Sequence, residues 1–212
     1  MSKAEVAAMG TGLDTGRVNQ KARTRMAIVS AARELVRTGQ PVSMPAVAQA
    51  ALVSEPTAYR YFPDLLSLLT EAFADLWPDP EQAMQPVAGS GDPAERVAYA
   101  TEFLLRHVLA CQGAVRAMIA ATIARPELTG NRPGLRFGLI DHALAPMRDT
   151  LAVTDPDAYA QLRRDLSVVV SAEALFTLTD LCGLTPADAI TSAVHTARTL
   201  TEAAFRPTAV TS

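Results

Sequence analysis

The sequence predicts an all-α protein, built from a small N-terminal domain of short helices and a larger C-terminal helical domain. Apolar residues recur with helical periodicity wherever a pattern is visible, and no stretch alternates apolar and polar residues for long enough to form a half-buried strand. Prolines and glycines separate these periodic stretches, most densely in residues 78–93, which contain four prolines and read as a loop. The expected divisions are a flexible basic arm over residues 1–20, a first domain over 21–65 and a second over 66–212.

The composition excludes two classes of protein. With 49% hydrophobic residues among 212, the chain has enough apolar material for a core, which argues against bulk disorder. Charged residues interrupt every apolar stretch before it reaches about 18 residues, so we expect no membrane span. Residues 1–20 carry two acidic residues and lack the apolar run of a secretory signal, so we expect a cytoplasmic protein.

Charge is distributed unevenly along the chain. Residues 1–65 contain eight Lys and Arg against five Asp and Glu, a net charge of +3, whereas residues 66–212 have a net charge of −6. A basic N-terminal third on an acidic remainder is typical of a small module that binds a polyanion, attached to a larger body with another purpose.

The first domain is expected to begin with a helix from about Lys21 to Thr38, which Gly39 ends as a C-terminal glycine cap. The apolar face of this helix carries Ile28, Val29, Ala32, Leu35 and Val36. Ser43 is expected to cap a second, short helix, and Ser54 a third one that follows a tight turn.

Helices continue beyond this unit. Asp64 is expected to cap a fourth helix that runs to Trp77. Glycine and proline then separate five further helices, over about residues 94–110, 114–124, 134–152, 157–182 and 187–206. Cys111 and Cys182 occur in this part without CxxC spacing, so we expect free thiols and no thiolate metal site.

Residues 43–62 form a candidate helix-turn-helix. Its two short helices can cross closely because the side chains between them are small or branched, namely Val47, Ala48, Ala51, Val53 and Ala58. The exposed face of the third helix is then expected to hold Glu55, Thr57, Arg60 and Tyr61. The second helix of such a unit can lie in the major groove of DNA, where hydroxyl groups contact phosphates and arginine reads guanine.

This segment resembles a known DNA-binding signature. Its run V-A-x-x-A-x-V-S-x-P-T-x-Y-R-Y-F-P, over residues 47–63, is similar to that of the tetracycline-repressor-like (TetR) family, and the similarity extends over residues 25–69. Less specific similarity to one branch of the family follows at residues 132–147 and 173–189. The resemblance implies a three-helix DNA-binding domain and a larger helical domain that dimerises through its last two helices and holds a ligand pocket.

The resemblance also implies roles for single residues. Ser43 would contact a phosphate while capping its helix, and Ser54 would cap the recognition helix. The side chains implied to face DNA are Thr57, Arg60 for a base and Tyr61 for a phosphate. Tyr59 and Phe62 would pack inward. Glu55 has two interpretations, an acceptor for a cytosine amino group or an exposed acid favoured by the helix dipole.

Two positions depart from the family pattern. Leu52 stands where the turn usually has glycine, so a positive φ there would cost about 1–3 kcal/mol unless the turn is reshaped or packing compensates. Leu65 stands where a phosphate-binding lysine commonly opens the fourth helix, so one phosphate contact is in doubt. Basic residues near the arm could replace it at phosphates or in the minor groove, or could form a solvated tail. They are Arg17, Lys21, Arg23 and Arg25.

Residues 157–182 and 187–206 are expected to mediate homodimerisation. Two helices per subunit with apolar faces rich in small side chains can form a four-helix interface around a twofold axis. These faces comprise Leu166, Val169, Val170, Ala174, Leu181, Ile190, Val194, Ala197 and Ala204. By pattern alone they could instead complete the core of one subunit; the resemblance favours dimerisation.

The resemblance places a ligand pocket among the fourth to eighth helices. The candidate lining residues are Phe73, Trp77, Phe103, His107, Met118, Phe137, His142 and Phe176. For each of them the alternative is an ordinary core position. His107 and His142 are polar groups among apolar neighbours and can therefore orient a ligand. With three histidines and no i, i+4 histidine pair, neither a metal site nor a cofactor is expected.

The expected function is that of a ligand-responsive dimeric transcriptional regulator of the repressor type. It would bind a palindromic operator in double-stranded DNA and leave it when a small apolar or amphipathic effector binds. No enzyme and no catalytic residue are expected, since the sequence has no GxSxG, HExxH, glycine-rich phosphate loop or EF-hand pattern. The alternative is a helical adaptor on the same fold that has lost specific DNA binding, an interpretation that rests on Leu52 and Leu65.

Overall fold

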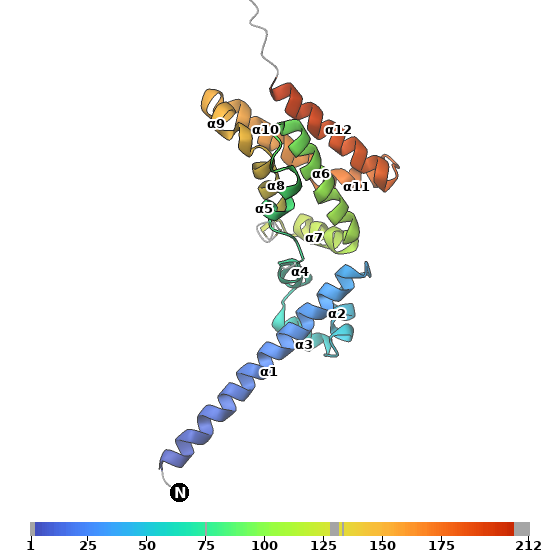
Figure 1. Cartoon of the computed structure of the whole chain (residues 1–212). Helices are drawn as coiled ribbons and strands as arrows, with labels where there is room; N and C mark the ends of the chain where they lie inside the picture. Colours follow the sequence, from blue (N-terminus) through green and yellow to red (C-terminus); the bar gives the residue numbers. More distant parts are fainter. Residues whose placement is uncertain (1–2, 75, 128–131, 133, 206–212) are drawn as a thin grey trace, which may run out of the picture. The chain divides into compact units, whose positions relative to one another are not determined.

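The computed structural model describes the backbone of residues 3–74, 76–127, 132 and 134–205, and the side chains in these ranges except those of 3–17 and 149–152. All regular elements in these ranges are helical, which confirms the predicted all-α class (Figure 1). The chain divides into two compact units. Unit 1 consists of Met1–Leu76 and Arg116–Arg132, and unit 2 of Trp77–Val115 and Pro133–Ser212.

Unit 1 begins with the long helix α1 (Lys3–Arg37), drawn in blue in Figure 1. This differs from the predicted arm over residues 1–20 and helix from about Lys21, because the backbone is helical from Lys3 onward. No proline precedes Pro41, and a glycine inside a helix costs only about 1 kcal/mol relative to alanine. The local sequence therefore permits the longer helix.

Three predicted helix caps of unit 1 are present. Gly39 has a φ of +68°, the left-handed conformation of a glycine that ends a helix. The Ser43 hydroxyl accepts a hydrogen bond from the Ala46 N–H at 3.3 Å. The Asp64 carboxylate accepts one from the Ser67 N–H at 2.8 Å. These contacts span no more than three residues, so local sequence is enough to set them.

Three short helices complete the part of unit 1 that follows α1: α2 (Met44–Ala50), α3 (Glu55–Tyr61) and α4 (Leu65–Phe73). α1 packs against α2 and α4, and α2 packs against α3. Their shared core buries Ile28, Ala32, Val47, Ala58, Phe62, Leu66 and Leu69, each at most 2% exposed. Burying a large apolar side chain contributes about 1.5–3 kcal/mol. This core fixes which side of each short helix faces outward.

Unit 2 is organised around α6 and α12, which lie along each other, and α10 packs against both α12 and α8 (Figure 1). Its elements are α5 (Pro80–Ala83), η1 (Gln85–Val87), α6 (Pro93–Ala110), α8 (Leu135–Ala143), α9 (Ala145–Thr154), α10 (Pro156–Val169), α11 (Ala172–Phe176), η3 (Thr177–Leu181) and α12 (Pro186–Ala204). Helix α7 (Gln112–Ala124) begins in unit 2 and continues in unit 1. No single described helix is long and apolar enough to cross a membrane; only the bent pair α6 and α7, counted together, reaches that length and composition.

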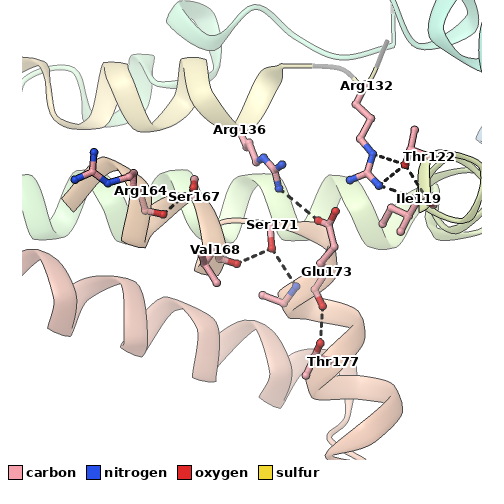
Figure 2. Close-up of polar contacts among 11 residues, drawn as sticks. Ile119, Thr122, Arg132, Arg136, Arg164, Ser167, Val168, Ser171, Glu173 and Thr177 are labelled. Carbon is pink, nitrogen blue, oxygen red and sulfur yellow. Dashed lines mark hydrogen bonds and ion pairs between the residues drawn. The ribbon is translucent and has the colours of Figure 1, made fainter. Parts of the chain in front are cut away.

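The helix predicted over residues 157–182 is interrupted at Ser171. This residue has extended backbone and caps α11, because its hydroxyl accepts from the Ala174 N–H at 3.0 Å and donates to the Val168 carbonyl at 2.7 Å (Figure 2). Three consecutive valines precede Ser171, and both β-branched residues and serine have a low helix propensity. The predicted single helix is therefore wrong, and the chain forms α10, α11 and the π-helical turn η3 instead.

Four of the nine apolar residues expected to mediate dimerisation face the interior of unit 2, and four others are half-buried, namely Val169, Ala174, Val194 and Ala204. Leu166 and Val170 are fully buried, as is Ala197, and Ile190 is 6% exposed. These four residues therefore complete the core of their own unit. Leu181, in contrast, is 82% exposed. Dimerisation itself remains a prediction.

Arg96 on α6 is a buried cation at the centre of unit 2. It is 6% exposed, and its guanidinium donates to the carbonyls of Ala143 at 3.0 Å and His142 at 2.6 Å, at the end of α8. It also donates to the Val87 carbonyl at 2.6 Å and the Ala88 carbonyl at 3.2 Å. Carbonyls at a helix end have no partner within the helix, so Arg96 caps α8 and holds the 87–90 loop to α6.

Candidate nucleic-acid interface

The outward face of α3 is the candidate for contact with DNA. Ala58 is fully buried and Phe62 is 2% exposed, so one side of this helix is fixed against the core. The exposed residues on the helix are Glu55, Pro56, Tyr59 and Arg60, while Thr57 and Tyr61 are half-buried. Of the side chains predicted to face DNA, Arg60 and Glu55 are exposed, whereas Thr57 and Tyr61 lie at the edge of the exposed face.

The position of Tyr59 differs from the one that the resemblance implied. It was expected to pack inward, but 47% of the residue is exposed. Residues four apart share one side of a helix, so Ala58 and Phe62 define the buried stripe. Tyr59 lies about 100° around the helix from Ala58 and is turned outward. The spacing of Ala58 and Phe62 was the signal that could have identified Tyr59 as a candidate contact.

Polar side chains on α3 contact one another. Ser54 stands at the N-cap position, as predicted, but its hydroxyl makes no capping bond to the backbone. It lies 2.9 Å from the hydroxyl of Thr57 instead. The Arg60 guanidinium carbon lies 5.6 Å from the centroid of the Tyr61 ring, a cation–π distance. Neither contact involves a carboxylate, so the Arg60 guanidinium keeps its N–H donors for an external acceptor.

The sequence left two possibilities for the turn before α3, a reshaped turn or a strained positive φ at Leu52. The structure has the positive φ. Leu52 has a φ of +55°, the one positive φ of a non-glycine residue in the described ranges. Its N–H donates to the Gln49 carbonyl at 3.1 Å and the Val53 N–H to the Ala48 carbonyl at 3.0 Å, which is the usual end of a helix with a left-handed residue. Leu52 is 93% exposed, so packing does not compensate for the strain. The turn thus holds a leucine in the left-handed conformation that glycine adopts without strain.

The basic residues of α1 divide into two groups. Arg25 forms an ion pair with Glu71, and its guanidinium carbon lies 4.4 Å from the centroid of the Phe62 ring. Arg25 therefore links α1 to the ends of α3 and α4 while its side chain stays 44% exposed, and its contact with DNA remains a prediction. Lys21 and Arg23 are exposed and remain candidates for phosphate contact. The side chain of Arg17 lies outside those described.

At the start of α4 the interface lacks a cation on the helix itself. Leu65 is the first residue of α4, and the preceding Asp64 caps the helix. Arg125 of unit 1 lies 3.5 Å from the Asp64 carboxylate, so this positive charge is paired with an acid.

The eight candidate ligand residues are divided between the two units. Phe73 and Met118 are buried residues of unit 1, at 2% and 5% exposed. In unit 2, Phe176 is 9% exposed and belongs to the core, whereas Phe137 on α8 is 47% exposed. The backbone carbonyl of His142 accepts from Arg96. A ligand pocket shared by these residues remains a prediction.

Three of the candidates do come together in unit 2. The ring centroids of Phe103 and His107 are 4.2 Å apart, and those of Trp77 and His107 are 6.5 Å apart. Tyr99, which sequence reasoning missed, stacks on Phe103 at 6.2 Å. Tyr99, Phe103 and His107 are four residues apart on α6 and so form a row on one side of it. We call these three residues and Trp77 the α6 aromatic row.

The cysteines of unit 2 are both free. Cys111 follows the aromatic row, and its thiol donates to the His107 carbonyl at 3.1 Å. Burial raises the pKa of Cys111 to about 11, which keeps this thiol protonated and unreactive at neutral pH. Cys182 is exposed. No group of three or more His, Cys, Asp or Glu residues is arranged to hold a metal ion in the part of the chain that the structure describes.

Comparison with known proteins gives no further assignment: no protein-family model, curated protein or solved structure matches this chain.

Proposed function

We propose that the chain is a sequence-specific DNA-binding regulator of transcription, of the repressor type, which acts as a homodimer and responds to a small effector. The observation that carries this proposal is the α2–turn–α3 unit. Its turn keeps a φ of +55° at an exposed leucine, and its second helix directs Tyr59 and Arg60 away from the core. A two-helix unit with an outward second helix fits the major groove of DNA.

Arg60 is the proposed base-reading residue. Its planar guanidinium can donate two parallel hydrogen bonds to O6 and N7 of guanine, a contact that discriminates against other bases by about 1–3 kcal/mol. The hydroxyls of Thr57 and Tyr59 are proposed to contact phosphates and fix the orientation of α3. Glu55 and Arg60 have opposite charges, so the exposed face of α3 is not strongly basic, and Lys21 and Arg23 on α1 supply additional attraction for the phosphates.

The proposed dimer explains how one short helix could achieve specificity. Two copies of α3 separated by about 34–36 Å would read successive turns of a palindromic operator. An effector would release the operator only if it binds a dimer conformation with another separation more tightly than the DNA-bound conformation. The α6 aromatic row is the proposed effector site, since apolar rings beside one polar imidazole suit a small apolar or amphipathic molecule.

DNA selection from a random duplex pool, followed by fluorescence anisotropy, tests the proposal. We expect a palindromic sequence that the full chain binds more tightly than a scrambled duplex in about 150 mM salt. Tyr59→Phe removes an exposed hydroxyl and should weaken this binding by about 1 kcal/mol, whereas Tyr61→Phe, the matched change at the edge of the face, should have a smaller effect. Equal affinity of the native chain for selected and scrambled duplexes would contradict the proposal.

The second candidate is a helical adaptor without specific DNA binding. The strained, exposed Leu52 and the uncharged Leu65 at the start of α4 favour it. An adaptor would yield no enriched sequence in the selection, and Arg60→Ala would leave its residual affinity for DNA unchanged. The same experiment therefore separates the two functions.

A further inference from the structure

A groove on unit 2 lies between α8 and α10, apart from the α6 aromatic row. It has a volume of about 190 Å³. Its lining residues are Phe137, Ile140, Ala160, Arg163, Arg164 and Ser167. The α10 residues among them recur three or four positions apart and therefore share one side of that helix. We call this feature the α8–α10 groove.

One part of the groove is apolar and aromatic. Phe137 is 47% exposed although it is a phenylalanine on a helix of the bundle. The guanidinium carbon of Arg136 lies 4.9 Å from the centroid of its ring, so a cation–π contact orients the ring. Ile140 and Ala160 extend the apolar lining. A flat apolar group can therefore stack on the exposed ring of Phe137.

The other part of the groove is cationic, and its two arginines differ in their partners. Arg163 donates to the Asp141 carboxylate at 2.7 Å, so this charge is balanced and its fork is held in place. Arg164 donates only to the neutral amide oxygen of Gln161, at 2.8 and 3.2 Å. Among the described residues, Arg164 pairs with no carboxylate. The guanidinium of Arg136, which precedes Phe137 in the sequence, lies 3.4 Å from the Glu173 carboxylate (Figure 2). Arg164 is thus the cation that an external anion can engage.

We propose that the α8–α10 groove binds a small aromatic carboxylate. A carboxylate matches the planar fork of Arg164 and can form two parallel charge-assisted hydrogen bonds with it. The attached ring would lie against Phe137 and Ile140. Sites for drug-sized ligands have volumes of about 300–1,000 Å³, so a groove of about 190 Å³ suits a single ring. This proposal does not depend on DNA binding, and failure of the operator experiment would leave it intact.

A titration of the isotope-labelled full chain with benzoate, followed by amide chemical shifts, tests the site. We expect saturable shifts on α8 and α10 at millimolar benzoate, and at least about fivefold weaker binding of benzamide, which has the same shape without the charge. Arg164→Gln should weaken benzoate binding at least about fivefold. Arg106→Gln is the matched control, because it removes one exposed arginine of unit 2 that pairs with Glu102 on α6.

Three outcomes would overturn the proposal. One is the absence of saturable shifts up to about 10 mM benzoate, which corresponds to a free energy of binding weaker than about −3 kcal/mol. The second is equal weakening by Arg164→Gln and Arg106→Gln, which would indicate general charge attraction only. The third is a set of shifts confined to the α6 aromatic row, which would place the anion elsewhere in unit 2.

Discussion

Arg60 in unit 1 and Arg96 in unit 2 carry the same guanidinium group in opposite surroundings. Arg60 is exposed and rests on the ring of its neighbour Tyr61. Arg96 is 6% exposed and donates to backbone carbonyls of η1, the following loop and α8. A buried charge is tolerated only when its donors are matched, whereas an exposed charge keeps its donors for a partner. The comparison shows that surroundings, rather than residue type, decide whether an arginine stabilises the fold or is available for binding.

The largest effect is expected from Arg96→Leu. Removing the guanidinium leaves several buried carbonyls without a donor, so the free energy of unfolding should fall by at least about 3 kcal/mol. Urea denaturation followed by circular dichroism measures this change. The control is Arg106→Leu on the same helix, whose exposed ion pair with Glu102 should contribute less than about 1 kcal/mol. Similar losses in the two variants would show that Arg96 is not a structural centre.

A smaller effect, on the free energy of DNA binding rather than of unfolding, is expected from Arg60→Ala. Specific DNA binding should weaken by about 1–3 kcal/mol, while binding to a scrambled duplex should change little because one base contact is lost. The free energy of unfolding should stay within about 0.5 kcal/mol of the native value, since the side chain is exposed. Anisotropy titrations and urea denaturation of one protein preparation give both quantities. A large loss of stability would remove the contrast with Arg96.

The next largest changes in stability are expected at the two residues of unit 1 that have a positive φ at the end of a helix, Leu52 and Gly39. Leu52→Gly should raise the free energy of unfolding by about 1 kcal/mol, because glycine adopts a φ of +55° without strain. Gly39→Ala should lower it by about 1 kcal/mol, because Gly39 has a φ of +68°. Gly89→Ala is the control, since a Cβ there meets open space and the backbone needs no positive φ. No gain from Leu52→Gly would mean that the turn relaxes around leucine.

The last effect, a decline in stability that is confined to alkaline pH and is absent near neutrality, is expected from a single thiol of unit 2. Burial raises the pKa of the Cys111 thiol to about 11 in the folded chain, above the ordinary thiol value of 9.0. The folded state therefore holds this proton more tightly than the unfolded state, and the resulting stabilisation is complete below about pH 9 and is lost as the pH rises toward about 11. Cys111→Ala should flatten the decline in the free energy of unfolding over this range. In the native chain, a thiol reagent at neutral pH should label the exposed Cys182 before Cys111; the reverse order would contradict the burial of Cys111.

Much of the candidate interface was predictable because its chemistry is local. The caps Ser43 and Asp64 bond to N–H groups three residues away, and Gly39 supplies the left-handed residue that ends α1. The positions of Ala58 and Phe62 likewise determine which side of α3 is buried. Their spacing contained the information that Tyr59 faces outward, and the error at Tyr59 came from following the family resemblance rather than the helix geometry.

Local sequence is enough to specify the all-α class, the caps and the buried stripe of α3, because these depend on contacts within about one helical turn. The role of Arg96 as a buried centre depends on the packing of distant helices, since its acceptors at the end of α8 lie 46 and 47 residues further along the chain. The pairing of Arg25 with Glu71, 46 residues away, likewise depends on how α1 and α4 pack. A charged side chain has the same local sequence signature whether it meets water, DNA or a distant carbonyl. Its partner is set by how the helices pack.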